Sequence, residues 1–493
     1  MKTTSELTHK TRNNAPSLVL SLLPVAMMLC SLVAIIIFEG SDAISSYSPF
    51  ILLISALFAV TLSLASRTCS RKGLASGMKR SSTQILPAIP LLILIAIIST
   101  TWLLSGVVPT LIDYGIRLLN PTFFLVTTCA VCAIVSVLTG SSWTTIATIG
   151  VAFIGIGRIM GYSEGWIAGA IISGAYFGDK VSPLSDTTVI ASSSCGVDLF
   201  DHIRYLMLTS IPAMVIALIV FMSVGLISEP AVIDASSSEI VAALRDTFNI
   251  SLWTLIIPLI VGILIACRVK TLYTLAVGSV LGVAGIFVFQ PGILSAIEGV
   301  GLHSVSDHIM STLRILWSET TVSTGNEALD SFVSTGGITG MLPTIFLVLC
   351  AMLFGAAMIG TGMLAVIAGA FTRRLKRRHS IVGATVAGGL FLNSCTADQY
   401  LSIIIGSNMY RDVYKRYSFQ PRLLSRTLED SVSVTSVLIP WNSCGVTQST
   451  VLGVATLTYL PFCIFNILSP MMTLLMAAIG FRIPTRKPQT LNA

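Results

Sequence analysis

Charged side chains are scarce in this sequence. They make up 10% of its 493 residues, whereas 54% of the residues are hydrophobic. Soluble domains carry about 25% charged residues, so this composition argues against a soluble fold. The net charge of +7 comes from basic residues in short loops between apolar stretches, which is where membrane insertion retains them. The positive charge therefore does not indicate a nucleic-acid partner.

The motifs of common enzymes are also missing. No Gly-x-x-x-x-Gly-Lys-Ser/Thr occurs, which argues against ATP as an energy source. No His-Glu-x-x-His occurs, and the five histidines are scattered. An intramembrane aspartyl protease would need glycine where Tyr176 precedes the Phe177-Gly178-Asp179 run. Cys129 and Cys132 have no further Cys or His at ligand spacing. We therefore expect no enzyme activity and no cofactor.

Long apolar stretches are abundant. Each is long enough to cross about 30 Å of hydrocarbon as a helix, so we predict an all-α polytopic membrane protein with about 10–13 transmembrane helices. Residues 16–480 are expected to form one transmembrane domain, and the basic tails 1–15 and 481–493 are expected to be cytoplasmic. The clearest apolar stretches are residues 16–38, 49–66, 86–108, 203–228, 250–267, 271–290, 343–371 and 456–480.

One apolar region is interrupted by a polar run at residues 178–188. The run holds Asp179, Lys180 and Asp186 together with a proline. A charged side chain near the bilayer centre costs roughly 2.5–3.5 kcal/mol by insertion scales. These charges must therefore be paired, bound to an ion or exposed to water. The run is the first candidate for a functional site.

A second interruption predicts a re-entrant hairpin at residues 380–408. Basic residues flank this apolar segment at 373–379 and 411–416, so both of its ends should lie on the cytoplasmic side. The segment must then turn back within the membrane, with residues 393–398 at its tip. Backbone without helical hydrogen bonds is tolerated at that depth only inside protein or beside a water-filled cavity. The tip is therefore a second candidate site.

The two interruptions align without gaps. Ser182 falls on Ser394, and Asp186 falls on Asp398. Polar interruptions at corresponding places in two halves are typical of transporters built from structural repeats, which are often inverted. We predict inverted repeats with re-entrant hairpins. The repeats would cover approximately residues 86–228 and 343–480.

A third interruption predicts a broken helix. The apolar run after Glu429 and Asp430 stops at residues 440–445, Pro-Trp-Asn-Ser-Cys-Gly, and then resumes. Proline removes a helical hydrogen bond, and glycine permits an unusual backbone conformation after it. The same pattern also fits an ordinary proline kink.

The three breaks are rich in oxygen ligands, which suit a small hard cation such as Na⁺. Burial disfavours the charged form of a carboxylate, so one buried aspartate can hold either a proton or Na⁺. We expect Asp186 and Asp398 to be the principal carboxylates that bind Na⁺ or H⁺. The full set of candidate ion- or proton-binding residues is Asp186, Asp398, Asp179, Ser182, Ser185, Thr187, Thr188, Asn393, Ser394, Thr396, Asn442 and Ser443. Glu429, Asp430, Ser141 and Thr144 are expected to support them.

Lys180 allows three interpretations. It can pair with Asp179 or with a carboxylate from the other half, it can lose its proton when Na⁺ arrives, or it can hold an organic anion. An adjacent Asp179–Lys180 pair is the favoured arrangement. His202 is expected in a loop beside Asp198 and Asp201, either as part of a solvated turn or as a pH sensor.

The motifs resemble those of NhaC-type Na⁺/H⁺ antiporters. The resemblance implies secondary antiport of Na⁺ against H⁺ in the cytoplasmic membrane of a prokaryote. It also implies inverted repeats with hairpins, and the family includes exchangers of small carboxylates such as malate and lactate. Many members have Asn-Leu-Ala where this chain has Val189-Ile190-Ala191, which leaves the substrate open. The matching motifs are the runs 174–188, 393–399, 424–430 and 439–445.

The leading prediction is therefore a Na⁺/H⁺ antiporter that works by alternating access. One alternative is an exchanger of small organic acids or amino acids coupled to Na⁺ or H⁺, and another is a channel. The expected partners are Na⁺, H⁺, the lipid bilayer and, under the first alternative, a small carboxylate. Residues 291–340 are amphipathic and are expected to form an external lid, interfacial helices or a contact in a homodimer.

Overall fold

The computed structural model describes residues 16–40, 43–68, 71–86, 88–228, 235–267, 269–298, 304–322, 330, 333–372 and 378–483. Regular structure in these residues is helical, apart from one antiparallel bridge between Thr320 and Thr335. The predicted all-α fold is confirmed.

Seven helical segments in the described residues are long and apolar enough to cross a membrane, and three bent pairs raise the number to as many as ten. The polytopic architecture with broken spans is thus confirmed, and ten lies at the lower end of the predicted count. The seven segments are α2 (Leu18–Glu39), α3 (Ala43–Ala65), α7 (Phe124–Thr139), α8 with α9 (Ser142–Thr145 and Val151–Ile159), α12 (Leu199–Ile227), α15 (Thr271–Phe289) and α19 (Gly337–Gly360). The bent pairs are α5 with α6 (Ala88–Leu104 and Val107–Leu118, 65°), α13 with α14 (Ala235–Thr247 and Ile256–Ala266, 84°) and α25 with α26 (Thr456–Tyr459 and Ile464–Ile479, 56°).

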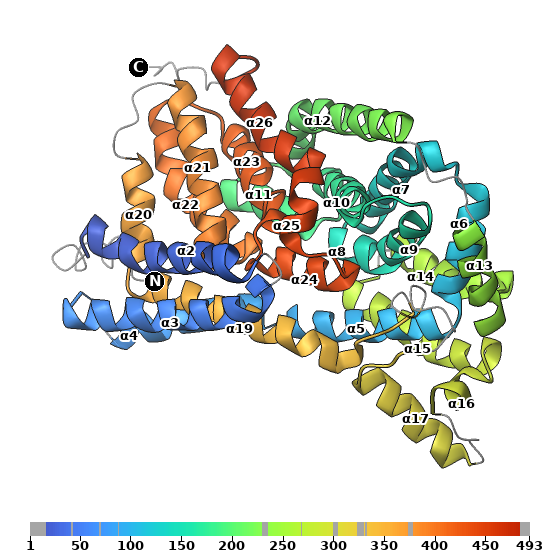
Figure 1. Cartoon of the computed structure of the whole chain (residues 1–493). Helices are drawn as coiled ribbons and strands as arrows, with labels where there is room; N and C mark the ends of the chain where they lie inside the picture. Colours follow the sequence, from blue (N-terminus) through green and yellow to red (C-terminus); the bar gives the residue numbers. More distant parts are fainter. Residues whose placement is uncertain are drawn as a thin grey trace.

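The remaining helices include those on either side of the two aligned interruptions. Helix α10 is followed by α11 after a short break, and α21 is followed by α22 in the same way. Helices α21 and α22 lie side by side (Figure 1). These helices are α4 (Arg71–Ile85), α10 (Glu164–Val181), α11 (Asp186–Cys195), α16 (Ile293–Glu298), α17 (Val305–Trp317), α20 (Met363–Thr372), α21 (Arg378–Thr396), α22 (Gln399–Arg416), α23 (Pro421–Leu428) and α24 (Ser443–Leu452).

Helices α7 and α10 are in close backbone contact. A Cβ atom on Gly174 would lie 2.1 Å from the carbonyl oxygen of Cys129, and one on Gly178 would lie 2.3 Å from that of Ala133. Glycine is required at both places because any side chain would force the helices apart, as at other small-residue contacts in membranes. Ser136 Oγ also donates a hydrogen bond of 2.6 Å to the Ala175 carbonyl. The end of α10 that carries Asp179 and Lys180 is thereby held in place.

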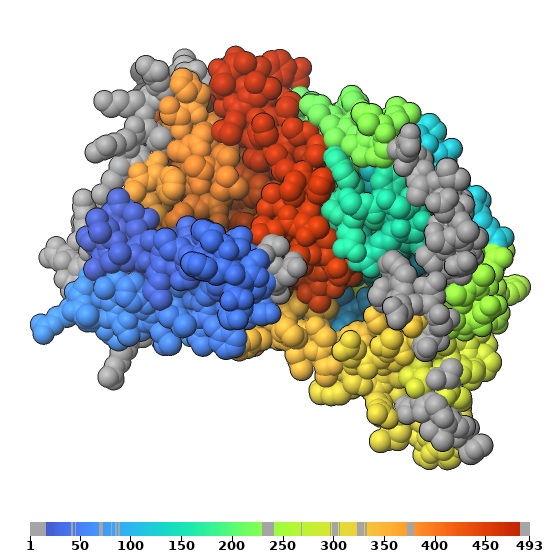
Figure 2. All heavy atoms as spheres, viewed as in Figure 1, coloured from blue at the N-terminus to red at the C-terminus, as the bar shows by residue number. Residues whose placement is uncertain are grey.

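Helix α26 joins the two hairpin regions. It packs against α10 and α12 on one side and against α21 on the other, and it forms the surface between them in Figure 2. The N-terminal helices α2 and α3 form a separate layer with α19 (Figure 1).

The structure adds detail to two predicted segments, the apolar stretch 343–371 and the amphipathic segment 291–340. The apolar stretch 343–371 is not one span, because α19 ends at Gly360 and α20 begins at Met363 after Gly362, which has a φ of +75°. In the amphipathic segment, α17 exposes Ile309, Met310, Leu313 and Trp317 along one face. A lid, an interfacial helix or a dimer contact at α17 stays a prediction.

Candidate functional site

The first break lies between α10 and α11. Helix α10 ends at Val181, and Ser185 caps the start of α11 by accepting a hydrogen bond of 3.4 Å from the Thr188 amide. Ser185 also shares a hydrogen bond of 2.9 Å with the Thr187 hydroxyl. Ser182 Oγ donates to the Val137 carbonyl at 2.8 Å. Three predicted ligand hydroxyls therefore stabilise the break itself.

Another break, outside the three predicted interruptions, separates α7 from α8. Gly140 takes a left-handed conformation with a φ of +64°, and Ser141 then caps α8 by accepting from the Thr144 amide at 3.2 Å. The amide and hydroxyl of Ser142 both donate to Asp179 Oδ2, at 3.2 and 2.8 Å. The carboxylate of Asp179 is thus bound at a helix N-terminus, where the partial positive charge stabilises it.

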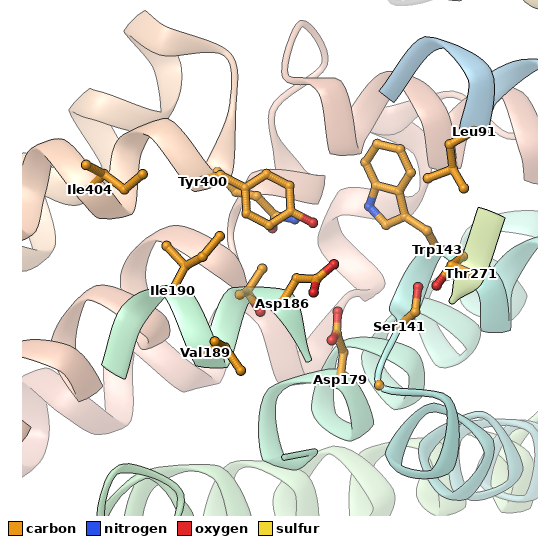
Figure 3. A pocket seen from close by; sticks show the side chains of 13 residues that line it. Leu91, Ser141, Trp143, Asp179, Asp186, Val189, Ile190, Thr271, Tyr400 and Ile404 are labelled. Atoms are coloured by element: carbon orange, nitrogen blue, oxygen red, sulfur yellow. The ribbon is translucent and has the colours of Figure 1, made fainter. Parts of the chain in front are cut away.

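These two breaks form one side of a cavity of about 450 Å³. The carboxylates of Asp179 and Asp186 point into the same space, and Trp143 and Tyr400 line it from the opposite side (Figure 3). The two aspartates are the only charged side chains among the described residues that line the cavity. The other lining residues are Leu91, Gly140, Ser141, Thr187, Val189, Ile190, Thr271, Gln399 and Ile404.

Asp398 does not line this cavity. Helix α21 ends at Thr396, Ala397 has a φ of +53°, and Asp398 caps α22 by accepting a hydrogen bond of 2.8 Å from the Leu401 amide. The next residues, Gln399 and Tyr400, reach the cavity instead. The structure therefore brings Asp186 together with Asp179, whereas Asp398 is buried at the tip between α21 and α22 and outside this cavity.

The third break binds the second hairpin tip directly. Asn442 Nδ2 donates to the carbonyl and side-chain oxygens of Asn393, at 3.2 and 3.1 Å. Asn442 Oδ1 accepts from the Cys444 amide at 3.1 Å, and Trp441 Nε1 donates to the Ser394 carbonyl at 2.9 Å. The side-chain oxygens of both asparagines are therefore hydrogen-bonded within the protein.

The remaining predicted residues at this tip also make internal contacts. Ser443 donates its amide hydrogen to the Ala397 carbonyl at 2.9 Å. The Thr396 hydroxyl shares a hydrogen bond of 2.6 Å with that of Ser402, and Ser394 Oγ donates to the Leu390 carbonyl at 3.1 Å. These residues hold the tip in shape and, like the asparagines, do not line the cavity.

Lys180 does not pair with its neighbour Asp179, so that prediction is wrong. Its ammonium group forms an ion pair with Asp430 and donates to Ser469 Oγ at 2.7 Å. Both charged side chains are almost fully buried, with exposed fractions of 1% and 0%. The helical geometry explains the difference, because consecutive residues point to different sides of a helix. The pair corresponds to the other partner considered for Lys180, a carboxylate from the second half.

Asp430 has further partners that the sequence did not single out. Thr209 donates to its carboxylate at 3.0 Å, Ser469 donates at 2.9 Å, and Thr473 also donates to it. Arg426, one helical turn earlier, approaches it at 4.0 Å and is itself fully buried. Arg426 and Asp430 are four residues apart in a helical segment, and this spacing could have predicted their proximity from the sequence. No local pattern could have identified Thr209, Ser469 and Thr473 as partners of Asp430.

His202 is not in a loop. It lies in α12, it is fully buried, and its Nδ1 atom is 2.9 Å from Ser425 Oγ. The prediction of a solvated turn is therefore wrong. The turn itself is formed by Asp198, which caps α12.

Comparison with known proteins gives a consistent result. Residues 174–481 match the family described as "Na+/H+ antiporter family". The chain is 37% identical to the Na(+)/H(+) antiporter NhaC of Alkalihalophilus pseudofirmus, over 80% of this chain and 82% of that protein. It is 35% identical to the malate-2H(+)/Na(+)-lactate antiporter of Bacillus subtilis, over 80% and 81%. It is 33% identical to the arginine/ornithine antiporter ArcD of Halobacterium salinarum, over 96% and 94%.

Proposed function

The chain belongs to the Na⁺/H⁺ antiporter family, and we propose that it exchanges Na⁺ for H⁺ across the cytoplasmic membrane by alternating access. The observation that carries the proposal is the cavity beside the α7–α8 and α10–α11 breaks. It contains two carboxylates and no basic side chain among its described lining residues. Two aspartates that face one space without a neighbouring basic side chain attract a small cation or a proton.

In this proposal Asp186 is the principal carboxylate of the cavity. It is the first residue of α11, and it has no ion-pair partner among the described residues. Asp179 and the Ser141 hydroxyl contribute further oxygen atoms to the same space. Asp398 is the second proposed carboxylate, and it caps the helix that carries Tyr400. Loss of the Asp398 carboxylate would change both the charge near the cavity and the cap of α22.

The cavity is proposed to face the cytoplasm in this conformation. An adjoining cavity shares Asp186 and Ser141 and is also lined by Lys270, which is exposed between α14 and α15. Basic residues in short loops are retained on the cytoplasmic side. Thr271→Cys should therefore react with a membrane-impermeant thiol reagent in inside-out vesicles. Labelling only in right-side-out vesicles would contradict this orientation.

The central test uses purified protein in vesicles with an imposed pH gradient. Addition of Na⁺ should dissipate the gradient, and Asp186→Asn or Asp398→Asn should abolish this effect. Asp412→Asn is a matched control, because the same chemical change is made on an exposed residue of α22. Normal Na⁺-driven dissipation by both Asp186→Asn and Asp398→Asn would rule out the assignment.

A second candidate substrate is an organic cation such as a basic amino acid. The cavity is far larger than a Na⁺ ion, and Trp143 and Tyr400 offer aromatic faces on which an ammonium or guanidinium group can bind. A dicarboxylate such as malate would instead meet two aspartates and no cation in the described lining. Exchange assays with labelled arginine, ornithine, malate and lactate distinguish these cases. Uptake of malate or lactate, with no response to arginine or ornithine, would exclude the organic cation.

A further inference from the structure

Glu429 is a buried carboxylate without a partner. Its exposed fraction is 0%, and neither carboxylate oxygen makes a hydrogen bond. Ser433, one turn later, also has a buried hydroxyl without a partner. Burial of an ionised carboxylate without a counter-charge or hydrogen bonds is very costly. In this conformation Glu429 is therefore neutral and carries a proton.

The local backbone is unusual as well. Residues Glu429–Ser433 form a π-helical turn between α23 and the third break. Such turns are rare and occur frequently at functional sites, where they redirect side chains. This turn packs against α11, α21, α22, α23 and α26. Glu429 therefore lies where the helix after the first interruption meets the two helices around the second.

The charged and titratable groups around Glu429 leave it without a free cation. Lys180 and Asp179 act on it from α10, and Cys195 acts from α11. Asp430 follows it directly, and Arg426 precedes it in α23. Lys180 is the cation that acts most strongly on Glu429, but its ammonium group is paired with Asp430.

Asp430 and Glu429 differ in how well they tolerate the loss of Lys180. Asp430 accepts hydrogen bonds from the hydroxyls of Thr209, Ser469 and Thr473. Arg426 also approaches it, so Asp430 can remain ionised without the lysine. Glu429 accepts no hydrogen bond in this conformation, although the hydroxyls of Ser433 and Thr187 lie close enough to act on it. If both carboxylates were ionised, Lys180 would therefore stabilise Glu429 more than it stabilises Asp430.

We propose that Glu429 carries the exchanged proton, and that Lys180 moves from Asp430 to Glu429 when this proton leaves. The inference rests on the proposed Na⁺/H⁺ antiport. The O–H bond of the Glu429 carboxyl group breaks, and the proton passes to water that enters when the site opens to one side of the membrane. Lys180 stays protonated throughout, and Asp430 keeps its negative charge.

Lys180 also connects this site to the cavity. Its carbonyl oxygen accepts a hydrogen bond of 3.1 Å from Thr188 Oγ1, in the first turn of α11. Asp186 begins that helix, and Asp179 precedes Lys180 in α10; both aspartates line the cavity. Movement of Lys180 therefore displaces the segment that carries the two cavity carboxylates, which couples the proton to the cation.

The transport test separates two reactions of protein reconstituted in vesicles. Na⁺/Na⁺ exchange, measured with labelled Na⁺ on both sides, needs no proton, whereas Na⁺/H⁺ exchange does. Glu429→Gln should retain Na⁺/Na⁺ exchange and lose Na⁺/H⁺ exchange, and Glu429→Asp should restore part of the latter. Loss of both reactions in Asp186→Asn supports the proposed function separately. Proton-coupled exchange that persists in Glu429→Gln would overturn the inference.

A second measurement does not depend on the substrate. Infrared spectra of the purified protein at neutral pH should contain a neutral carboxyl band that is absent from Glu429→Gln. The matched control is Glu164→Gln, because Glu164 is half-exposed and pairs with Arg158 at 2.7 Å, so its substitution should leave that band unchanged. Identical carboxyl bands in the wild type and Glu429→Gln would show that Glu429 is ionised, and the inference would fail.

Discussion

The buried pair of Lys180 and Asp430 allows a quantitative prediction. Removal of one partner from a buried ion pair costs about 3–5 kcal/mol, because the other charge is left without compensation. Asp430→Asn should reach this range, since Lys180 would lose its ion pair and keep only uncharged partners, such as the Ser469 hydroxyl and the Phe465 ring. Lys180→Met should cost less, about 1–3 kcal/mol, because Asp430 keeps three charge-assisted hydrogen bonds, each of which contributes about 1.5–3 kcal/mol.

The double variant tests the reasoning. When both charges are removed, neither is left unpaired, so Lys180→Met combined with Asp430→Asn should cost no more than Asp430→Asn alone. Residues in contact commonly show such coupling, by about 0.5–3 kcal/mol. The assay is the free energy of unfolding in mixed detergent micelles, followed by tryptophan fluorescence. The exposed Asp412→Asn should stay within about 0.5 kcal/mol of the wild type. Additive costs in the double variant would refute the pairing.

Three further predictions concern the breaks and the cavity. Gly140→Ala should strongly reduce the yield of folded protein, because the backbone carbon of Leu184 would lie 2.7 Å from the new Cβ atom and φ is +64°; gel filtration after detergent extraction measures this. Asn442→Ala should destabilise the protein by about 1–2 kcal/mol through the lost cap of α24, and by more through the lost contacts with Asn393; an unchanged thermal unfolding midpoint would contradict it. Val189→Asn adds an amide to the cavity wall, and it should lower the Na⁺ concentration at half-maximal exchange.

The positions of the breaks were predictable because they follow from local chemistry. Ser185, Asp398 and Asn442 begin α11, α22 and α24 as caps, and all three are residue types that favour this position. Proline marks two of these places, since Pro183 precedes α11 and Pro440 precedes α24. The predicted correspondence of Asp186 with Asp398 is offset by one residue in the structure, because Ser185 caps the first helix and Asp398 caps the second. The sequence alignment matched identical residue types, whereas the offset appears only when the helix caps are compared.

The partners across the fold were not predictable from the sequence. Lys180 and Asp430 are 250 residues apart, and their contact depends on how α10 and the π-helical turn both pack against α26. Trp143 lies in α8 and Tyr400 lies in α22, so their meeting at the cavity likewise depends on packing between segments that are far apart in the sequence. Hydrophobic patterns identify segments that are buried, but they do not determine which buried polar groups meet.

The buried and partly buried carboxylates fall into two groups, and the difference lies in their partners rather than in their depth. Asp113 is buried and binds Arg117 and Arg245, at 3.3 and 2.8 Å, and Asp430 is buried and binds Lys180. In the described residues, Asp179, Asp186, Asp398 and Glu429 form no ion pair. A carboxylate whose charge is already compensated by cations or hydrogen bonds has little affinity left for Na⁺ or H⁺, because binding would replace existing contacts. The proposed ion exchange should therefore depend on the second group, and substitution within the first group should affect stability more than the ion preference of the site.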